Sequence, residues 1–388
     1  LALLAATVWM LAADHRREWK EHQRTFRDRI EPWTTAATIA QREADASLAR
    51  GNPAELQAGN ERLGLALARQ RPSFGKWFLS LPLIDALGRP LAIEQVWLPE
   101  LQIDYNFCQV ARFDRCTTCH QGIDKVRDHN SPLPYAGEGV RAAYLPESTF
   151  TVALATPDQA PEVESENASQ RDASLRKTYG LALVPGMLDP ADVTVGCVLP
   201  KTPAAMAEIL AGDVVVAVDG RPIADRTDFE ERLLRGAAWG KPFALEIRRG
   251  VPQPYCGHPR MDLYVGSQSP HPLPAFGCTA CHEGQGSATG FKFASHTPND
   301  PGQRTRWRNE HGWFWNHDWV FPMLPKRFLQ SSCLKCHHDV SDLEPSPRFV
   351  DPPAPKLVAG YHLVRQLGCF GCHELNGIGE GGRRIGPD

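Results

Sequence analysis

The strongest constraint on this chain is a pentapeptide, Cys-x-x-Cys-His, which occurs four times in 388 residues, at 116–120, 278–282, 333–337 and 369–373 (motifs 1 to 4). Two thiols at this spacing can add to the two vinyl groups along one porphyrin edge, and the adjacent His can ligate the iron. A zinc site or a Cys-x-x-Cys redox pair is the alternative, but neither requires the His. The repeats therefore predict four haem c groups. Their attachment residues are Cys116, Cys119, Cys278, Cys281, Cys333, Cys336, Cys369 and Cys372, and their iron ligands are His120, His282, His337 and His373.

The motifs use eight of the eleven Cys residues and leave Cys108, Cys197 and Cys256. Cys197 lies in the apolar run VTVGCVL and is expected to be a buried thiol. Cys108 and Cys256 could form a disulfide in an oxidising compartment, which the sequence leaves open.

Each haem iron of an electron-transfer protein needs a sixth ligand, usually His or Met. Segments flanked by Pro or Gly, without helical periodicity, hold the best candidates among the 14 His residues. A surface or hydrogen-bonding role is the alternative for any one of them. The first-ranked candidates are His258, His271, His296 and His317, followed by His311, Met323, His338 and His129.

The chain begins with 13 uncharged residues, LALLAATVWMLAA, fewer than the roughly 20 that span a bilayer. This stretch is either the h-region of a signal peptide or the visible part of an uncleaved anchor, and the anchor is favoured. Because haem c is attached outside the cytoplasmic membrane, we expect a single N-terminal anchor in that membrane with the bulk of the chain on the periplasmic side. Residues 14–71 are predicted to form a helical stalk with breaks at Pro32 and at 51–53.

The long gap between motifs 1 and 2 contains a segment of different character. A polar, acidic stretch, PDQAPEVESENASQR, is typical of a linker. After it the pattern predicts two strands, a short helix at 203–211, a strand in DVVVAVDG, a helix in RTDFEERLLRGA and a strand in PFALEIRRG. Asp219-Gly220 suits the type I′ turn of a β-hairpin.

The stretch VLPKTPAAMAEILAGDVVVAVDGRPI resembles PDZ domains, especially bacterial ones. The resemblance implies an α+β domain in which the loop before the second strand, here 179–183, presents backbone N–H groups to the C-terminal carboxylate of a peptide. The groove helix would lie near 227–234. The domain would then bind a C-terminal peptide or a partner surface, or act as a spacer.

Three further stretches, DYNFCQVARFDRCTTCHQGID, HPRMDLYVGSQSPHP and SSCLKCHH, resemble membrane-anchored multihaem c-type cytochromes that accompany quinol-oxidising cytochrome b/Rieske-type respiratory complexes. The resemblance implies an electron-transfer subunit, not itself an enzyme, whose partners are other subunits of a membrane respiratory complex and a soluble or oxidase acceptor. The alternative is a multihaem reductase with one open catalytic haem, and the supply of spare His residues argues against it. A net charge of -3 gives no basic field for nucleic acid.

The closing stretch, GCFGCHELNGIGEGGRRIGPD, resembles the start of a class I cytochrome c domain, whose sixth ligand is usually a distant Met. No Met follows Met323, so we expect the polypeptide to continue beyond Asp388; otherwise His362 or a partner chain would cap this haem.

The predicted fold class is therefore mixed: an N-terminal membrane helix and helical stalk, a loop-rich multihaem cytochrome c region, an inserted α+β PDZ-like domain and the start of an all-α class I cytochrome c domain. The predicted boundaries are anchor 1–13, stalk 14–71, haem 1 segment 72–156, linker 157–176, PDZ-like domain 177–250, haem 2 and haem 3 domain 251–350, and the start of the cytochrome c domain with haem 4, 351–388.

Overall fold

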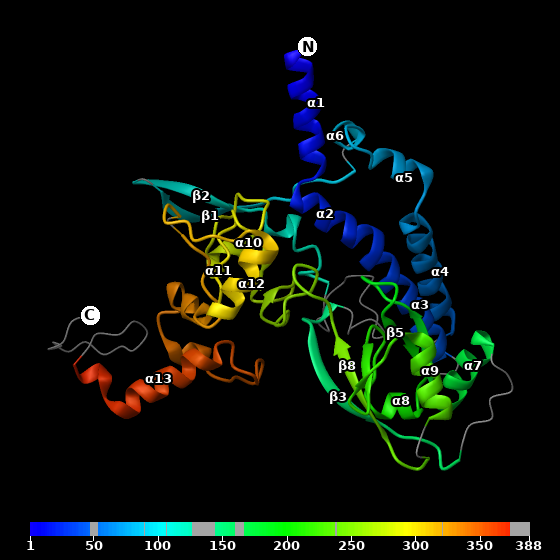
Figure 1. The fold of residues 1–388 in the computed structure, drawn as a ribbon. Coiled ribbons are helices and arrows are strands. Elements are labelled where there is room, and N and C mark those ends of the chain that lie inside the picture. The colour runs from blue at the N-terminus through cyan, green and yellow to red at the C-terminus, as the bar shows by residue number, and fades with distance from the viewer. Residues whose placement is uncertain are drawn as a thin grey trace. The chain divides into compact units, whose positions relative to one another are not determined.

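The structure, a computed structural model, describes residues 1–46, 53–88, 90–105, 107–125, 144–159, 167–236, 239–319 and 321–372. The chain divides into two units (Figure 1). The first unit comprises Leu1–Glu94 and Thr117–Pro272, and the second comprises Gln95–Cys116 and Leu273–Asp388.

A series of helices begins the first unit. They are α1 (Ala2–His15), α2 (Glu18–Thr25), a π-helical turn (Phe26–Ile30), α3 (Glu31–Ala46), α4 (Pro53–Gln70), α5 (Phe74–Leu79) and α6 (Ile84–Gly88). The predicted break at Pro32 is wrong, because α3 runs through this residue. The widened π-helical turn directly before it can accommodate the proline ring, which otherwise clashes with the carbonyl four residues earlier. Two residues of the second predicted break at 51–53, Gly51 and Asn52, lie outside the described residues.

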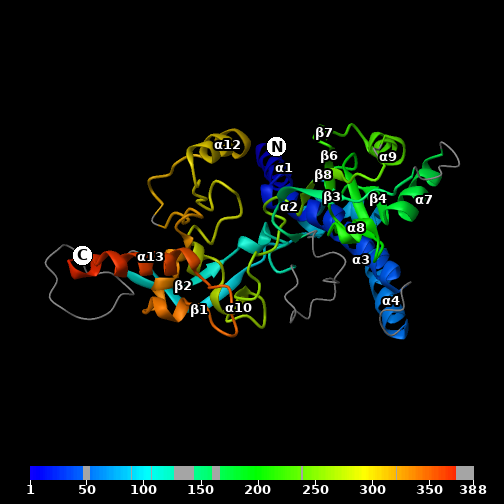
Figure 2. The same cartoon turned by 90° about the horizontal axis from the view of Figure 1, so that it is seen from below.

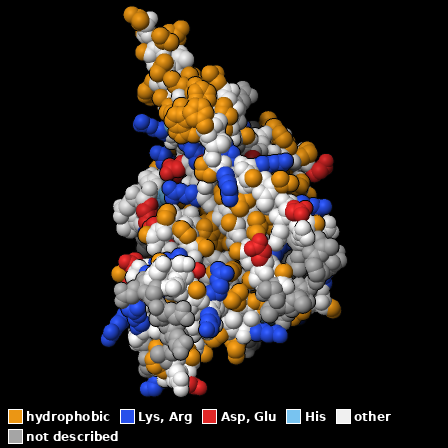
Figure 3. All heavy atoms as spheres, turned by 90° about the vertical axis from the view of Figure 1, so that its right-hand side faces the viewer, with side chains coloured by type: hydrophobic (Ala, Val, Ile, Leu, Met, Phe, Trp, Pro, Cys, Tyr) orange, Lys and Arg blue, Asp and Glu red, His pale blue; other side chains and the backbone are white. Residues whose placement is uncertain are grey.

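Helix α1 corrects the prediction of a membrane anchor. It comprises residues Ala2–His15. Its apolar side chains are exposed, Leu3 at 82% and Trp9 at 73%, and Figure 3 shows hydrophobic side chains gathered at this end of the chain. Within the described ranges, no helix combines the length and apolar character needed to cross a membrane. The predicted N-terminal membrane helix, the fold class that included it, and the single-anchor localisation in the cytoplasmic membrane are therefore wrong.

A six-stranded antiparallel sheet forms the centre of the inserted domain (Figures 1 and 2). Its strand order is β3-β8-β6-β5-β4, and the short β7 pairs with β6. The strands are β3 (Ser148–Leu154), β4 (Leu181–Pro185), β5 (Val193–Val198), β6 (Val214–Val218), β7 (Arg221–Pro222) and β8 (Phe243–Arg249), with helices α7 (Ala168–Thr178), α8 (Pro203–Met206) and α9 (Arg226–Arg235). Leu181, Val195, Phe229, Leu233 and Ile247 are fully buried in its core.

The β6–β7 hairpin is confirmed, because Asp219 and Gly220 have φ values of 50° and 73°, and a type I′ turn requires positive φ at both. Two other elements lie outside the predicted boundaries of 177–250. Strand β3 comes from the predicted haem 1 segment and pairs with β8 along its full length. Helix α7 lies largely in the predicted linker, where the Asn167 side chain accepts a hydrogen bond from Ser169 N at 3.0 Å and caps its first turn. The first unit ends with two short parallel strands, β9 (Tyr264–Val265) and β10 (His271–Pro272).

The second unit is built from one hairpin and short helical segments. Strand β1 (Val96–Tyr105) pairs antiparallel with β2 (Cys108–Asp114). The helices are α10 (Leu273–Phe276), α11 (Thr279–His282), α12 (Pro301–His311) and α13 (Pro355–Leu367), and 3-10 turns form at Leu329–Lys335, Val340–Leu343 and Cys369–Gly371. Val340, Leu343, Ala354 and Val358 form a small core that packs α13 against the 3-10 turns.

Candidate haem-attachment sites

Motif 2 is held by a buried carboxylate at the end of β2. Asp114 is 1% exposed and accepts hydrogen bonds from Cys278 N at 2.5 Å, Thr279 N at 2.9 Å and Thr279 Oγ1 at 2.7 Å. Gly277 has φ +61°, and a Cβ there would lie 2.4 Å from Asp114 Oδ2, so only glycine fits. Sequence analysis missed Asp114 because 164 residues separate it from Cys278.

Motifs 2, 3 and 4 share one backbone turn. In each, the second Cys N donates to the carbonyl of the first Cys at 3.2 Å. The His N of motifs 2 and 3 donates to the same oxygen, at 2.9 and 2.8 Å. Residues three apart in a helical turn lie on one face, so each turn presents both thiols to the same side, as attachment to one porphyrin edge requires.

Motif 4 follows α13 directly, after Gly368 ends the helix in a left-handed conformation with φ 72°. His373 lies outside the described residues, and its predicted role as an iron ligand stays a prediction. Nε2 of His362, the predicted alternative ligand of this haem, lies 3.3 Å from Glu344 Oε1.

Thiols from three motifs lie close together in the second unit. A hydrogen bond from Cys116 and burial raise the pKa of the Cys278 thiol. Burial also raises the pKa of Cys281, and the nearby Cys333 and Cys336 raise it further. Cys116 of motif 1 is therefore a neighbour of motif 2, and motif 2 is a neighbour of motif 3.

The rest of motif 1 belongs to the first unit. Thr118 is fully buried, and its Oγ1 donates to Glu94 O and accepts from Glu94 N, both at 3.0 Å. His258 N donates to Ile123 O at 2.9 Å, which places His258 beside the segment that follows His120. The Tyr264 ring lies between those of His258 and His271, at centroid distances of 5.2 and 5.4 Å. His258 and His271 therefore lie near the first-unit part of motif 1.

Hydrogen bonds at Nδ1 separate the four first-ranked ligand candidates into two classes. His271 Nδ1 lies 3.0 Å from Leu263 O, and His296 Nδ1 lies 2.7 Å from Phe291 O. A carbonyl only accepts, so these Nδ1 atoms carry the proton and the neutral rings have their lone pair on Nε2.

The other two rings have the opposite tautomer. His258 Nδ1 accepts from Arg260 N, and His317 Nδ1 accepts from Trp315 Nε1, each at 3.1 Å. Their neutral rings carry the proton on Nε2, so this nitrogen cannot ligate a metal without losing it. Judged by these hydrogen bonds, His271 and His296 are better candidates for ligating iron through Nε2 than His258 and His317.

The second-ranked candidates are more varied. The His311 ring stacks on Phe291 at 4.2 Å between centroids. Met323 is beside Gly284, where an added Cβ would lie 3.3 Å from Met323 Cε. His338 is exposed, and His129 lies outside the described residues.

Cys108 and Cys256, whose pairing the sequence leaves open, do not form a disulfide. The Cys108 side chain is exposed, whereas Cys256 is buried and accepts a hydrogen bond from Gln253 Nε2 at 2.8 Å. Cys197 is 5% exposed, which confirms its prediction as a buried thiol, and burial raises its pKa. Throughout the part of the chain that the structure describes, no three His, Cys, Asp or Glu side chains converge as in a zinc site.

Helix α7 contacts both β4 and α9 in the inserted domain, and Figures 1 and 2 show it beside these elements. Glu230 of α9 is 1% exposed and accepts from Arg171 Nε at 2.7 Å and from Arg226 Nε at 2.6 Å. Arg226 also pairs with Asp172 of α7 at 2.9 Å and donates to Leu183 O of β4 at 3.3 Å.

The predicted carboxylate loop, 179–183, overlaps the first residues of β4. It is joined to α9 as well, because Tyr179 OH donates to Leu233 O at 2.8 Å. Strand β4 is the edge of the sheet, where an added peptide strand would pair. Helix α7 therefore contacts both β4 and α9, and Arg226 of α9 links these three elements.

The comparison with family models finds a PDZ domain at residues 164–253. This confirms the predicted PDZ-like fold of the insert, and the matched range includes α7. A comparison with curated proteins finds no match.

Proposed function

We propose that this chain is a tetrahaem c-type cytochrome with an inserted PDZ domain, and that it transfers electrons through its covalently bound haems. The observation that carries the proposal is the turn common to motifs 2, 3 and 4, which presents two thiols on one face directly before a His. When bound, each haem supplies an iron that gains and loses one electron. The eight motif Cys residues would attach the haems, and His120, His282, His337 and His373 would each ligate one iron.

The electron route is proposed to run within a respiratory complex, from a quinol-oxidising cytochrome b/Rieske-type module to a soluble or oxidase acceptor. The resemblance of the motif segments to multihaem respiratory cytochromes suggests these partners. The closeness of Cys116, Cys278, Cys281 and Cys333 supports transfer from haem to haem, because attachment sites that adjoin hold their porphyrins near one another.

For the PDZ domain we propose docking or packing rather than capture of a free peptide. Helix α7 contacts both elements that border the peptide groove of this family, and Arg226 links them. A partner would then meet the outer surface of the domain.

Intact mass spectrometry of the full chain, produced in cells that attach haem c, tests the haem assignment. The mass should exceed that of the polypeptide by four haems. Cys278→Ser with Cys281→Ser should remove one haem, whereas Cys197→Ser should remove none. A parent chain without haem would contradict the proposed function.

Carbon monoxide binding to the reduced protein separates electron transfer from reductase activity. An electron-transfer protein with six-coordinate irons should bind little carbon monoxide at the haems of motifs 1 to 3. Strong binding at one of them would favour a multihaem reductase with an open haem.

A further inference from the structure

The segment before His296 is fixed against motif 2 by backbone hydrogen bonds. Leu324 N donates to His282 O at 2.9 Å, and the adjacent Met323 N donates to Ser295 O at 3.0 Å. The segment 321–324 thereby joins the proximal His of motif 2 to the residue directly before His296. Gln285 N also donates to Ala294 O at 3.1 Å. Two positions 14 residues apart in sequence are therefore neighbours in the second unit.

The backbone is strained next to both histidines. Glu283, directly after His282, has φ 58°, and Ser295, directly before His296, has φ 61°. Residues other than glycine adopt this region rarely, and such residues cluster at functional sites where the surroundings impose them. Ser295 is fully buried, so packing holds its conformation.

Phe291 orients the His296 ring through two contacts, and Trp313 holds the His296 backbone. Its Nδ1 donates to Phe291 O at 2.7 Å, and the Phe291 ring stacks on it at 4.2 Å with an interplanar angle of 4°. Trp313 Nε1 donates to the His296 carbonyl at 2.6 Å. An Nδ1–H bonded to a backbone carbonyl is the usual outer-shell partner of a metal-ligating His, since it fixes the ring and increases the basicity of Nε2.

We propose that His296 is the sixth ligand of the iron whose haem is attached at Cys278 and Cys281 and whose proximal ligand is His282. The inference rests on the proposed function and adds the axial pairing, His282 with His296, for one haem. Because Nδ1 keeps the proton, the Nε2 lone pair can bind iron without proton release. The competing candidate for this position is Met323, which lies in the segment 321–324 that joins His282 to Ser295.

Carbon monoxide binding to the reduced, haem-loaded full chain tests the pairing. His296→Ala should bind about one more carbon monoxide per chain than the parent, with the haem content unchanged by intact mass. His317→Ala is the matched control and should bind as much carbon monoxide as the parent. The His317 Nδ1 accepts a hydrogen bond, so its neutral ring carries the proton on Nε2 and is a poorer iron ligand. A haem-loaded His296→Ala chain that binds no more carbon monoxide than the parent overturns the inference and leaves the proposed function standing.

Added imidazole distinguishes a vacant iron from a disturbed fold. In His296→Ala it should suppress the additional carbon monoxide binding by occupying the vacated position. Additional carbon monoxide binding that imidazole does not suppress overturns the inference. It is also overturned if His296→Ala binds as much carbon monoxide as the parent while Met323→Leu binds one more per chain. A parent chain that carries no haem overturns the proposed function together with this pairing.

Discussion

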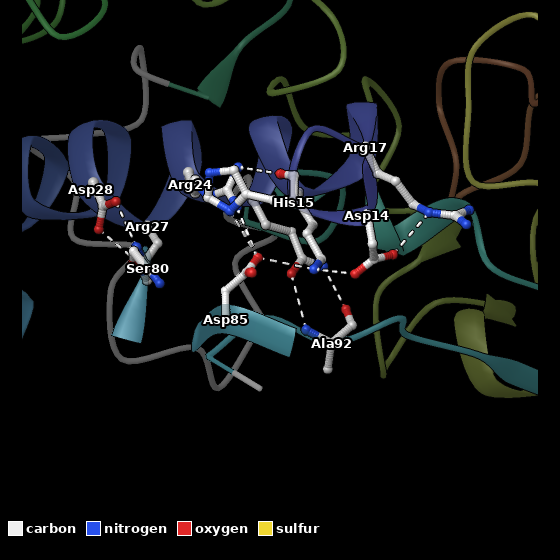
Figure 4. A network of polar contacts seen from close by, with 11 residues as sticks. Asp14, His15, Arg17, Arg24, Arg27, Asp28, Ser80, Asp85 and Ala92 are labelled. Atoms are coloured by element: carbon white, nitrogen blue, oxygen red, sulfur yellow. Dashed lines mark hydrogen bonds and ion pairs between the residues drawn. The ribbon is translucent and has the colours of Figure 1, made fainter. Parts of the chain in front are cut away.

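Asp85 is a buried carboxylate that neutralises basic groups from the first two helices (Figure 4). Its side chain is 1% exposed, and its Oδ2 lies 3.0 Å from Lys20 Nζ, 3.2 Å from Arg24 Nη2 and 3.1 Å from His15 Nδ1. Lys20, at 6% exposure, also pairs with Asp14 at 2.6 Å. The ion pairs tie α6 to α1 and α2 in the first unit.

Asp85→Asn should lower the free energy of unfolding by about 3–5 kcal/mol, the usual result of removing one partner from a buried ion pair. The cause is the charge of Lys20, which remains buried with only Asp14 to balance it. Denaturant unfolding of the haem-loaded chain measures the change. Asp28→Asn is the control: its ion pair with Arg27 is exposed, and the loss should be at most about 1 kcal/mol. Equal losses in the two variants would contradict the argument.

The same carboxylate predicts a pH dependence. Burial alone would raise the pKa of Asp85, but hydrogen bonds and charges from Lys20 and His15 outweigh it, and the pKa is lowered. In the unfolded chain the pKa is about 3.9. The unfolded state therefore binds the proton first, and the stabilisation from Asp85 is complete above about pH 4 and is lost as the pH falls towards the folded pKa. The free energy of unfolding of Asp85→Asn should fall less steeply with decreasing pH in this acid range than that of the parent, as measured by denaturant unfolding at several pH values. An unchanged slope against pH would refute the prediction.

Helix α7 depends on ion pairs at the buried Glu230 more than on its own sequence. Arg171→Ala should weaken its docking by about 1.5–3 kcal/mol, the range for a hydrogen bond to a charged group. We expect amide hydrogen exchange across 168–178 to accelerate at least about tenfold. Lys177→Ala, at an exposed position of the same helix, should change exchange little. Unchanged exchange in Arg171→Ala would mean that the bond from Arg171 to Glu230 is not needed, and that packing of Leu175 and the ion pair of Asp172 with Arg226 hold the helix.

The elements of the PDZ domain were predictable where their signals are local. Asp219-Gly220 predicts its hairpin by turn chemistry, a continuous apolar run predicts β6, and alternating apolar residues predict β8. Helix α7 escaped prediction because its sequence, ASQRDASLRKT, is polar and buries Leu175 alone. Strand β3 escaped because its partner β8 lies about ninety residues later, and pairing at that separation leaves no local pattern.

At the scale of the whole chain, the spacing of Cys and His predicts the attachment sites but not which segments meet. Asp114 meets Thr279, and the segment before His296 meets motif 2, only through the fold of the second unit. The tautomers that sort the ligand candidates depend on carbonyls such as Phe291 O. The membrane helix was predicted from apolar composition, whereas no helix in the described ranges is both long and apolar enough to cross a membrane.

A charged pair joins motifs 2 and 3, and under the proposed function it should shift the midpoint potentials of the haems attached there. Lys335 pairs with Glu283 and donates to Ala280 O at 3.3 Å, so both charges lie beside two attachment sites. Oxidised iron carries one more positive charge than reduced iron. Lys335→Gln should therefore lower the midpoint potentials of the adjacent haems, and Glu283→Gln should raise them.

The size of these opposite shifts follows from Coulomb's law. A unit charge about 9 Å away at an effective dielectric constant near 40 contributes about 1 kcal/mol, or about 40 mV for one electron. Partial exposure of Lys335 reduces this, so we expect about 20–40 mV in spectroelectrochemical titrations. The double variant should return towards the parent, and high salt should shrink both single-variant shifts. Shifts of the same sign in the two single variants would rule out a direct electrostatic effect of this pair on the haems of motifs 2 and 3.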